Sequence, residues 1–402
     1  MGPGRPPASR PDIPPGSREL VRAPRAPPWK TARPMRGVLR SSLIILTLVL
    51  SAVAGAATPA AKHHGFHDRA PDEARVERVL QSLSPREKVG QLLLAYPQVG
   101  KENPVEVGGV LFVGGTLRKL EAARERIRSS RERARVPPFF AVDIEGGGFN
   151  RLNRHPALKT LPSAREMAGM EDAEVEAWGV RVGKAMREVG LNMNLAPVFD
   201  VSPSGHMFRN GRAFSGDPEV VKQKATAFAR GLAKAGVVSI GKHFPGYGDL
   251  DSDSDHVQAI ADWEVERIRK EASAFRAADR FLGGVMMSNI VYEKLGKAPA
   301  ILEPSLVAMA HESGWVSVTD DVAIRALAEH LGTEREEVVR RAFLAGNDLI
   351  LTTEPPDWSG GLDYFGILTK LAESAPKAAE QLDAAVRRVL RLKDRMGLLD
   401  GM

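Results

Sequence analysis

The sequence contains no cysteine among its 402 residues. This absence excludes disulfide bridges, cysteine-ligated zinc or iron–sulfur centres, and catalysis by a thiol nucleophile. The G-x-S-x-G turn, the Walker loop and the H-E-x-x-H zinc motif are missing as well. Apolar residues nevertheless make up 43% of the chain, which is enough for a sizeable core. The composition indicates a globular protein whose chemistry rests on side chains other than cysteine.

Positive charge is concentrated at the beginning of the chain. Residues 1–40 contain nine Lys and Arg but two acidic residues, a balance of +7 against a net charge of +6 for the whole chain. The net charge of the remaining residues is therefore −1. This distribution argues against nucleic-acid binding by a basic domain.

The first residues have the composition of a leader. Residues 1–34 are rich in Pro and Arg without apolar periodicity, so we expect them to be disordered, or not translated if Met35 is the true start. Residues 35–61 combine two arginines, an apolar stretch and small residues, which is the layout of a secretory signal peptide. The uncharged run 41–61 also approaches the length of a membrane anchor. We therefore expect an exported protein, periplasmic or extracellular, with membrane association if the signal is retained.

The rest of the chain is predicted to be one domain. Residues 62–75 form a polar linker, whose three histidines are interpreted as a flexible tail rather than a metal site, and residues 76–402 form the domain. Ser84 and Glu87 form a capping box, and we expect the helix that it starts to continue through residues 88–95.

Seven short apolar runs alternate with amphipathic segments along this domain. They lie at residues 108–113, 138–143, 191–196, 237–242, 283–288, 315–320 and 348–353. Buried parallel strands separated by helices predict a (β/α)₈ barrel with one strand not placed. A doubly wound open sheet is the alternative, but no G-x-G-x-x-G follows the first run.

Polar residues follow several of these strands, including Asp143, Asp200, Lys242, His243 and Asp320. A single Asp after a strand is usually a helix cap, but in a barrel the carboxyl ends of the strands form the catalytic face. Paired carboxyl groups with polar sugar-binding partners are the minimal equipment for glycoside cleavage.

The stretch GKHFPGYGDLDSDSDHVQ, residues 241–258, is crowded with acidic residues. A calcium loop is one interpretation, but Ser254 and Ile260 stand where an EF-hand needs Gly and Glu. A loop that delivers an acid to a substrate is the other. We expect no metal and no cofactor.

Several motifs together resemble glycoside hydrolase family 3, and most closely its single-domain bacterial β-N-acetylglucosaminidases. They are VDIEGGGFNRL, LNMNLAPVFDV, GRAFSGDPEVV, KHFPGYGD, TDDVAI and VRRVLRLKDRMGLLD, in this order, and the match runs from about residue 82 to about residue 399. The resemblance implies a retaining exo-β-glycosidase that removes terminal β-N-acetylglucosamine from peptidoglycan fragments or related oligosaccharides. It leaves the oligomeric state open.

The resemblance also implies roles for individual residues. Asp320 would be the nucleophile, Asp321 a cap or structural residue, and Asp200 a supporting group. The residues that would bind the sugar are Asp143, Arg151, Arg212, Lys242 and His243.

The acid/base loop departs from the family pattern of Asp-Ser-His. Here the order is Asp253, Ser254, Asp255, His256. We expect His256 to be the acid/base, paired with Asp253 or Asp255, because imidazole exchanges protons near neutral pH. The alternatives are that Asp255 is the acid or that the loop is not catalytic.

Three further departures concern the sugar site. Tyr247 and Asn289 stand where the family commonly has His, and Gly148 stands where an Arg is expected. They leave two alternatives open: a glycan-binding pseudoenzyme, and a hydrolase for another β-sugar such as glucose or xylose.

Overall fold

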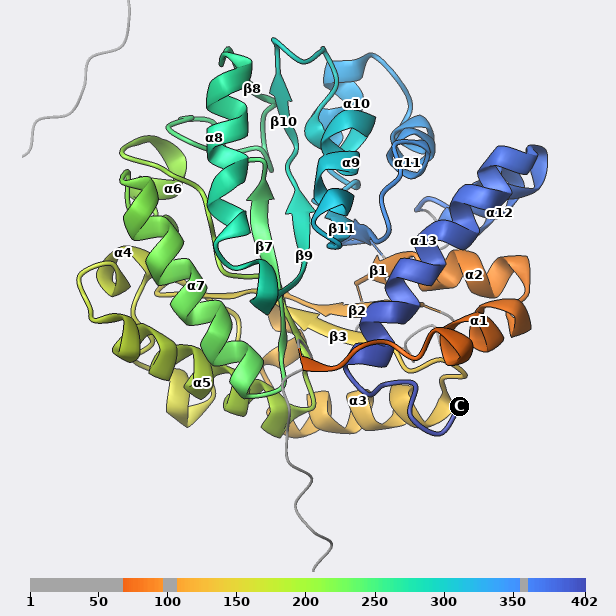
Figure 1. The fold of residues 1–402 in the computed structure, drawn as a ribbon, viewed down its shortest axis with the longest axis horizontal. Helices are drawn as coiled ribbons and strands as arrows, with labels where there is room; N and C mark the ends of the chain where they lie inside the picture. The colour runs from red at the N-terminus through yellow and green to blue at the C-terminus, as the bar shows by residue number, and fades with distance from the viewer. Residues whose placement is uncertain (1–67, 97–106, 355–360) are drawn as a thin grey trace, which may run out of the picture. The chain divides into compact units, whose positions relative to one another are not determined.

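The computed structural model describes residues 68–96, 107–354 and 361–402 (Figure 1). The predicted leader, the predicted signal or anchor and residues 62–67 of the predicted linker lie outside these described residues. Among the described residues, no helix has both the length and the apolar character to cross a membrane.

Eight parallel strands form the centre of the domain. They are β1 (Leu93–Ala95), β2 (Gly109–Phe112), β3 (Phe139–Val142), β6 (Met193–Asn194), β7 (Val238–Phe244), β9 (Leu282–Met287), β11 (Val316–Thr319) and β12 (Ile350–Thr352). Each pairs with its neighbour in chain order, and β1 pairs with β12. A parallel bridge between Val318 and Leu349 joins the two remaining edges, so the ring is nearly continuous. The predicted (β/α)₈ barrel is therefore confirmed.

The strand that the sequence did not place is β1. Helix α2 (Pro85–Gln91) begins with the predicted capping box, in which Ser84 Oγ accepts from the Glu87 amide and Glu87 Oε2 accepts from the Ser84 amide. The prediction that this helix continues to residue 95 is wrong, because Leu93–Ala95 pairs with β2 and β12. All three residues of β1 are buried, so they form an apolar run that resembles a buried helix segment.

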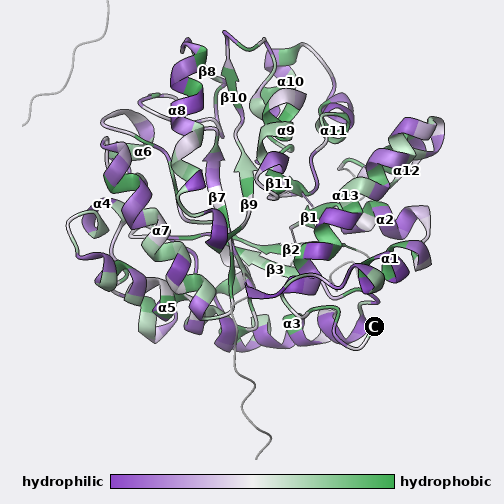
Figure 2. Ribbon diagram, viewed as in Figure 1, coloured by the Kyte–Doolittle hydropathy of each residue, from purple (hydrophilic) through white to green (hydrophobic). Residues whose placement is uncertain are grey.

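Helices surround the ring of strands. They are α1 (Glu73–Ser82), α2, α3 (Leu120–Arg133), α4 (Ala164–Met167), α5 (Asp172–Val189), α6 (Gly205–Arg209), α7 (Pro218–Lys234), α8 (Val265–Arg276), α9 (Pro304–Glu312), α10 (Arg325–Leu331), α11 (Arg335–Leu344), α12 (Tyr364–Ser374) and α13 (Pro376–Arg395). Figure 2 shows that strands β2, β3 and β9 are mostly hydrophobic, whereas the helices around them carry both hydrophobic and hydrophilic residues. Gly179 in α5 allows close packing on α7, because a Cβ there would lie 2.3 Å from the Phe228 carbonyl oxygen.

Helices α1 and α13, from near the two ends of the described chain, lie side by side (Figure 1). Arg75 Nη1 lies 2.9 Å from the buried Asp394 carboxylate, whose other oxygen accepts from the Asp72 amide at 2.8 Å. Arg391 forms a further ion pair with Glu73 at 2.9 Å. These contacts fix the first helix to the last one.

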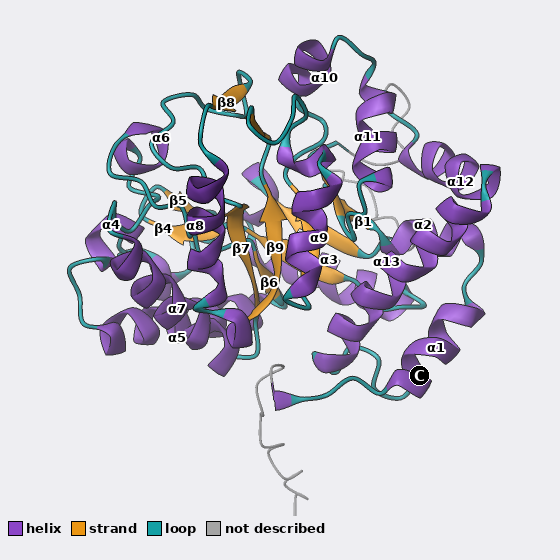
Figure 3. Ribbon diagram, turned by 45° about the horizontal axis from the view of Figure 1, so that its top comes forward, coloured by secondary structure: helices purple, strands orange, loops and turns teal. Residues whose placement is uncertain are grey.

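Short elements extend the strands at their carboxyl ends. Strands β8 (Ala259–Ala261) and β10 (Ile290–Tyr292) pair in parallel beyond β7 and β9 (Figures 1 and 3). Strands β4 (Ile144–Gly146) and β5 (Phe149–Asn150) form a hairpin directly after β3. The loops at this end of the barrel contain the polar residues singled out in the sequence.

Candidate active site

The carboxyl ends of the strands surround a cavity of about 480 Å³. Its apolar lining includes Leu111, Leu195, Met286 and Leu351, which come from β2, the end of β6, β9 and β12. These are the second, fourth, sixth and eighth strands of the ring, and side chains from alternate strands form one layer of a barrel core. The cavity therefore has an apolar floor beneath its charged groups.

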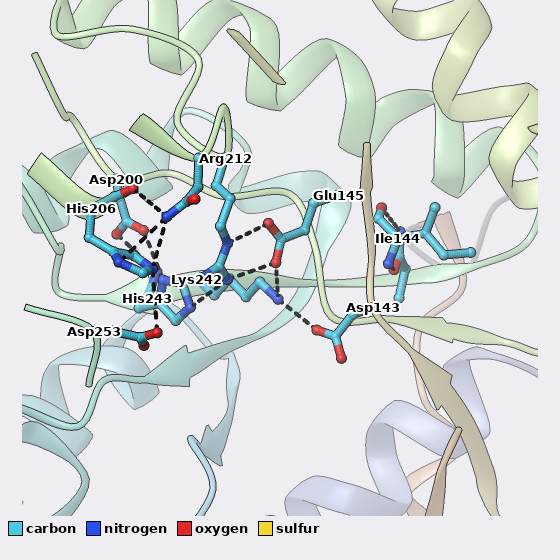
Figure 4. Close-up of polar contacts among 11 residues, drawn as sticks. Asp143, Ile144, Glu145, Asp200, His206, Arg212, Lys242, His243 and Asp253 are labelled. Atoms are coloured by element: carbon cyan, nitrogen blue, oxygen red, sulfur yellow. Dashed lines mark hydrogen bonds and ion pairs between the residues drawn. The ribbon is translucent and has the colours of Figure 1, made fainter. Parts of the chain in front are cut away.

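Four charged side chains form one network on the wall of the cavity (Figure 4). Lys242 Nζ lies 2.6 Å from Asp143 Oδ1 and 2.7 Å from Glu145 Oε1. Arg212 donates to both oxygens of Glu145, each at 2.8 Å, and its guanidinium lies over the Phe149 ring at 4.5 Å. The Lys242 and Glu145 side chains are each 3% exposed, so the network excludes most water.

The charges in this network stabilise one another. Burial opposes ionisation of Glu145, but Arg212 and Lys242 hold the pKa of its carboxyl far below its usual range. Burial likewise opposes the charge of Lys242, but Asp143 and Glu145 raise the pKa of its ammonium group. The network therefore offers both charged donors and charged acceptors to a polyhydroxylated ligand.

Glu145 is a site residue that the sequence analysis missed. The buried Asn194 of β6 accepts from the Ile144 amide and donates to the Ile144 carbonyl oxygen, both at 3.0 Å. This pairing keeps the backbone extended past the end of β3, so residues 143 and 145 face the same side while Ile144 points away (Figure 4). The Asp-x-Glu spacing directly after a predicted strand was the available signal.

His243 is oriented by Asp200, the predicted supporting residue. The imidazole Nδ1 lies 2.8 Å from Asp200 Oδ2, and Asp200 Oδ1 accepts from the backbone amides of His243 and Tyr247 at 3.1 and 2.9 Å. The other ring nitrogen, Nε2, lies 3.4 Å from Arg212 Nη2. Asp200 thus places a proton on Nδ1 and leaves Nε2 as an acceptor towards the cavity.

Asp320, the predicted nucleophile, lies on the cavity directly after β11. Its amide donates to the Met287 carbonyl oxygen at 2.9 Å, and its Oδ1 accepts from the Asp321 amide at 2.9 Å. Burial raises the pKa of the Asp320 carboxyl to about 6, with a further contribution from the charge of Asp255 and an opposing one from His243. The carboxyl is therefore mostly ionised at neutral pH.

Asp321 has a structural set of contacts. Its carboxylate accepts from the amides of Ala323 at 2.9 Å and Thr353 at 3.2 Å, and from the Thr353 hydroxyl. Burial raises the pKa of this carboxyl above its usual value. These contacts tie the loop after β11 to the end of β12.

The structure separates the candidates for the acid/base. Asp253 and Asp255 both line the cavity. The His256 side chain is 80% exposed and is not part of the lining, and its Nε2 lies 3.8 Å from Asp253 Oδ2. His206 of α6, which the sequence analysis did not single out, approaches the same Asp253 oxygen at 3.9 Å.

The remaining predicted residues lie at the rim or behind the wall. Arg151 lines the exposed rim, and its amide donates to the Asp143 carbonyl oxygen at 3.2 Å. Nothing lies within 4 Å of a Cβ built on Gly148, so this position leaves open space. Asn289 is buried and donates to the Asp321 carbonyl oxygen at 3.2 Å.

The acidic residues of the loop after β7 do not converge on one point. Asp249 pairs with Arg267 at 2.6 Å, and Asp251 pairs with Arg209. Across the part of the chain that the structure describes, no three His, Asp or Glu side chains are grouped to hold a metal ion.

A parallel barrel with a carboxylate-rich cavity at the carboxyl ends of its strands has the groups that glycoside cleavage requires. Residues 85–392 match the glycosyl hydrolase family 3 N-terminal domain, and the chain belongs to this family. The chain is 26% identical to a β-hexosaminidase of Idiomarina loihiensis over 288 residues, which cover 69% of this chain and 84% of that protein. It is 28% identical to a β-hexosaminidase of Bordetella parapertussis over 314 residues, with 74% and 84% covered.

A solved structure gives the same result. The β-N-acetylhexosaminidase of Beutenbergia cavernae superimposes with a TM-score of 0.69 at 27% identity, over 77% of this chain and 98% of that one. The family predicted from the sequence motifs is therefore confirmed, and the protein is a glycoside hydrolase.

Proposed function

We propose that the protein is a retaining exo-β-N-acetylhexosaminidase that removes terminal, non-reducing β-N-acetylglucosamine from peptidoglycan fragments or related oligosaccharides. The position of Asp320 carries this proposal. Its carboxylate shares one cavity with Asp143 and Lys242 at the carboxyl ends of the barrel strands. The similarity to proteins named β-hexosaminidase supports the choice of sugar.

The two steps follow from these positions. Asp320 attacks the anomeric carbon, and the bond to the aglycone oxygen breaks as that oxygen receives a proton. Water then cleaves the glycosyl ester and restores the Asp320 carboxylate with net retention. Asp143, Lys242, Arg212 and the Nε2 atom of His243 offer acceptors and donors for ring hydroxyls and the acetamido group.

The shape of the cavity supports exo action. Its floor is a layer of the barrel core, so a sugar unit that enters the cavity has no exit on the far side, which suits binding of a terminal sugar.

Hydrolysis of 4-nitrophenyl β-N-acetylglucosaminide by the purified protein tests the proposal. We expect nitrophenol release with a β-configured initial sugar product in NMR spectra, and a loss of at least about a thousandfold in Asp320→Asn. Asp251→Asn is the matched control, because Asp251 is an exposed carboxylate paired with Arg209 outside the cavity. Binding of N-acetylglucosamine oligomers without turnover would instead identify a glycan-binding pseudoenzyme.

The glycine at position 148, where the family pattern has an Arg, favours one second candidate, a family 3 hydrolase for β-glucose or β-xylose. Without that side chain no contact from this position to a sugar substituent is made. A panel of 4-nitrophenyl glycosides separates this candidate from the first by the ratio of kcat/KM values.

We also propose that the protein is exported, on the basis of the signal-like composition of residues 35–61. Fractionation of cells that produce the full chain, with N-terminal sequencing of the product, tests this. A cytoplasmic product that keeps residues 35–61 would contradict it.

A further inference from the structure

Asp255 is the residue of the acidic loop that acts most directly on Asp320. Both side chains line the same cavity. In addition to burial, the charge of Asp255 raises the pKa of the Asp320 carboxyl, and it raises the pKa of the Asp321 carboxyl as well. Asp255 and Asp320 therefore disfavour simultaneous ionisation, as expected of a carboxyl pair that holds one proton. Retaining glycoside cleavage requires a second carboxyl group in the same site as the nucleophilic carboxylate.

The loop that carries Asp255 is anchored to the barrel by Tyr247. The buried Tyr247 hydroxyl donates to the Ser252 carbonyl oxygen at 2.6 Å and accepts from the Ser254 amide at 2.9 Å. The Tyr247 amide is in turn fixed by Asp200 at 2.9 Å. Tyr247 therefore links Ser254, the residue immediately before Asp255, to the Asp200 carboxylate that orients His243.

The side chain of Asp253 completes this local geometry. Its Oδ1 accepts from the Asp255 amide at 3.1 Å, while its Oδ2 faces His206 and His256 at 3.9 and 3.8 Å. Asp253 is thus engaged in holding the turn, and His256 lies on its outer side. Asp255 is left facing the cavity.

We propose that Asp255 is the acid/base of the reaction, in place of a histidine, and that Tyr247 is a positioning residue for it. This inference rests on the proposed function. In the first step the Asp255 carboxyl gives its proton to the aglycone oxygen as the bond from C1 to that oxygen breaks and Asp320 forms an ester with C1. In the second step water attacks C1, its proton passes to the Asp255 carboxylate, and the ester bond breaks to release Asp320.

The chemistry of the leaving group separates Asp255 from His256. A general acid matters more when the leaving oxygen is more basic, so phenyl β-N-acetylglucosaminide depends on it more than the 4-nitrophenyl substrate does. We expect Asp255→Ala to lose about 10²- to 10⁴-fold in kcat/KM on the phenyl substrate and less on the nitrophenyl substrate. Asp251→Ala, an exposed carboxylate of the same loop, is the matched control.

Azide provides a second measurement. It needs no base to attack the glycosyl ester, so in Asp255→Ala we expect azide to restore nitrophenol release and to yield the β-glycosyl azide. Tyr247→Phe should show the same pattern more weakly, with the same leaving-group dependence. A merely destabilised variant would instead lose activity equally on both substrates.

Each outcome decides between the proposals. Asp255→Ala with kinetics like those of Asp251→Ala overturns the assignment, as does a leaving-group-dependent loss with azide rescue in His256→Ala. In either case the proposed function still holds if Asp320→Asn is inactive, because that loss depends on the nucleophile and not on the acid/base. A wild-type protein that cleaves no glycoside overturns the proposed function and this inference with it.

Discussion

His243 is held by Asp200 at two points, through its imidazole Nδ1 at 2.8 Å and through its backbone amide at 3.1 Å. Both groups are buried. The double attachment fixes the position of the ring and also the nitrogen that carries its proton. The Nε2 atom of His243, which faces Arg212, is therefore an acceptor only because Asp200 fixes the proton on Nδ1.

We expect Asp200→Asn to lower kcat/KM about 10- to 100-fold. The asparagine retains the shape of the side chain, but its amide nitrogen can face Nδ1 and favour a proton on Nε2. The His243 Nε2 would then be a donor facing the Arg212 guanidinium, which is also a donor. Steady-state kinetics together with thermal unfolding check this, and an unchanged kcat/KM in a folded variant would contradict the role of Asp200.

Glu145→Gln should lower the free energy of unfolding by about 3–5 kcal/mol, because it leaves two buried cations without their shared carboxylate. Urea unfolding at neutral pH measures this loss. Glu121→Gln is the control, since Glu121 forms an exposed pair with Arg124. A loss no larger than that of the control would show that Lys242 and Arg212 do not depend on Glu145.

The activity should fall on the acid side of about pH 6. The pKa of the Asp320 carboxyl is raised to about 6, and only the ionised form is a nucleophile. Because kcat/KM reports the free enzyme, we expect its logarithm to decrease by about one per pH unit below pH 6. An acid limb near pH 4 would indicate that the carboxyl is not perturbed as described.

Lys393 of α13 is fully buried, and its Nζ donates to Gln91 Oε1 at 2.7 Å. Burial lowers the pKa of this ammonium group from 10.5 to about 7. Between these values the unfolded chain binds the proton and the folded chain does not, so wild-type stability should rise with pH.

We therefore expect Lys393→Met to be more stable than wild type at pH 6 by about 1–4 kcal/mol, with the difference disappearing towards pH 10. Urea unfolding at several pH values measures it. Lys377→Met on the exposed side of the same helix is the control. A difference that does not change with pH would contradict the buried-charge explanation.

Much of the barrel could be predicted because buried parallel strands are continuous apolar runs. The runs at 138–143, 237–242 and 283–288 each became a strand with at most small shifts of its ends. The exception was β1, whose three apolar residues directly follow an amphipathic helix. Only pairing with strands far along the chain distinguishes it from one more helical turn.

The position of Asp143, Lys242 and Asp320 on the cavity could be predicted, because each belongs to a motif at or near the carboxyl end of a predicted strand. The site was not predictable where side-chain direction depends on distant contacts. Glu145 faces the cavity because Asn194 keeps its backbone extended. The sequence order of Asp255 and His256 does not say which one faces inwards, because the anchoring of their loop by Tyr247 is a tertiary contact.

The charged groups of the cavity come from β7 itself and from segments that follow four different strands, β3, β6, β7 and β11, between Asp143 and Asp321. A chain that stops before β11 could form helices and several strands but would lack the carboxylate at position 320. Recovery of turnover after dilution from denaturant should therefore lag behind recovery of helical circular dichroism. The recovery of enzymatic activity would thus report when the ring of strands is completed during refolding.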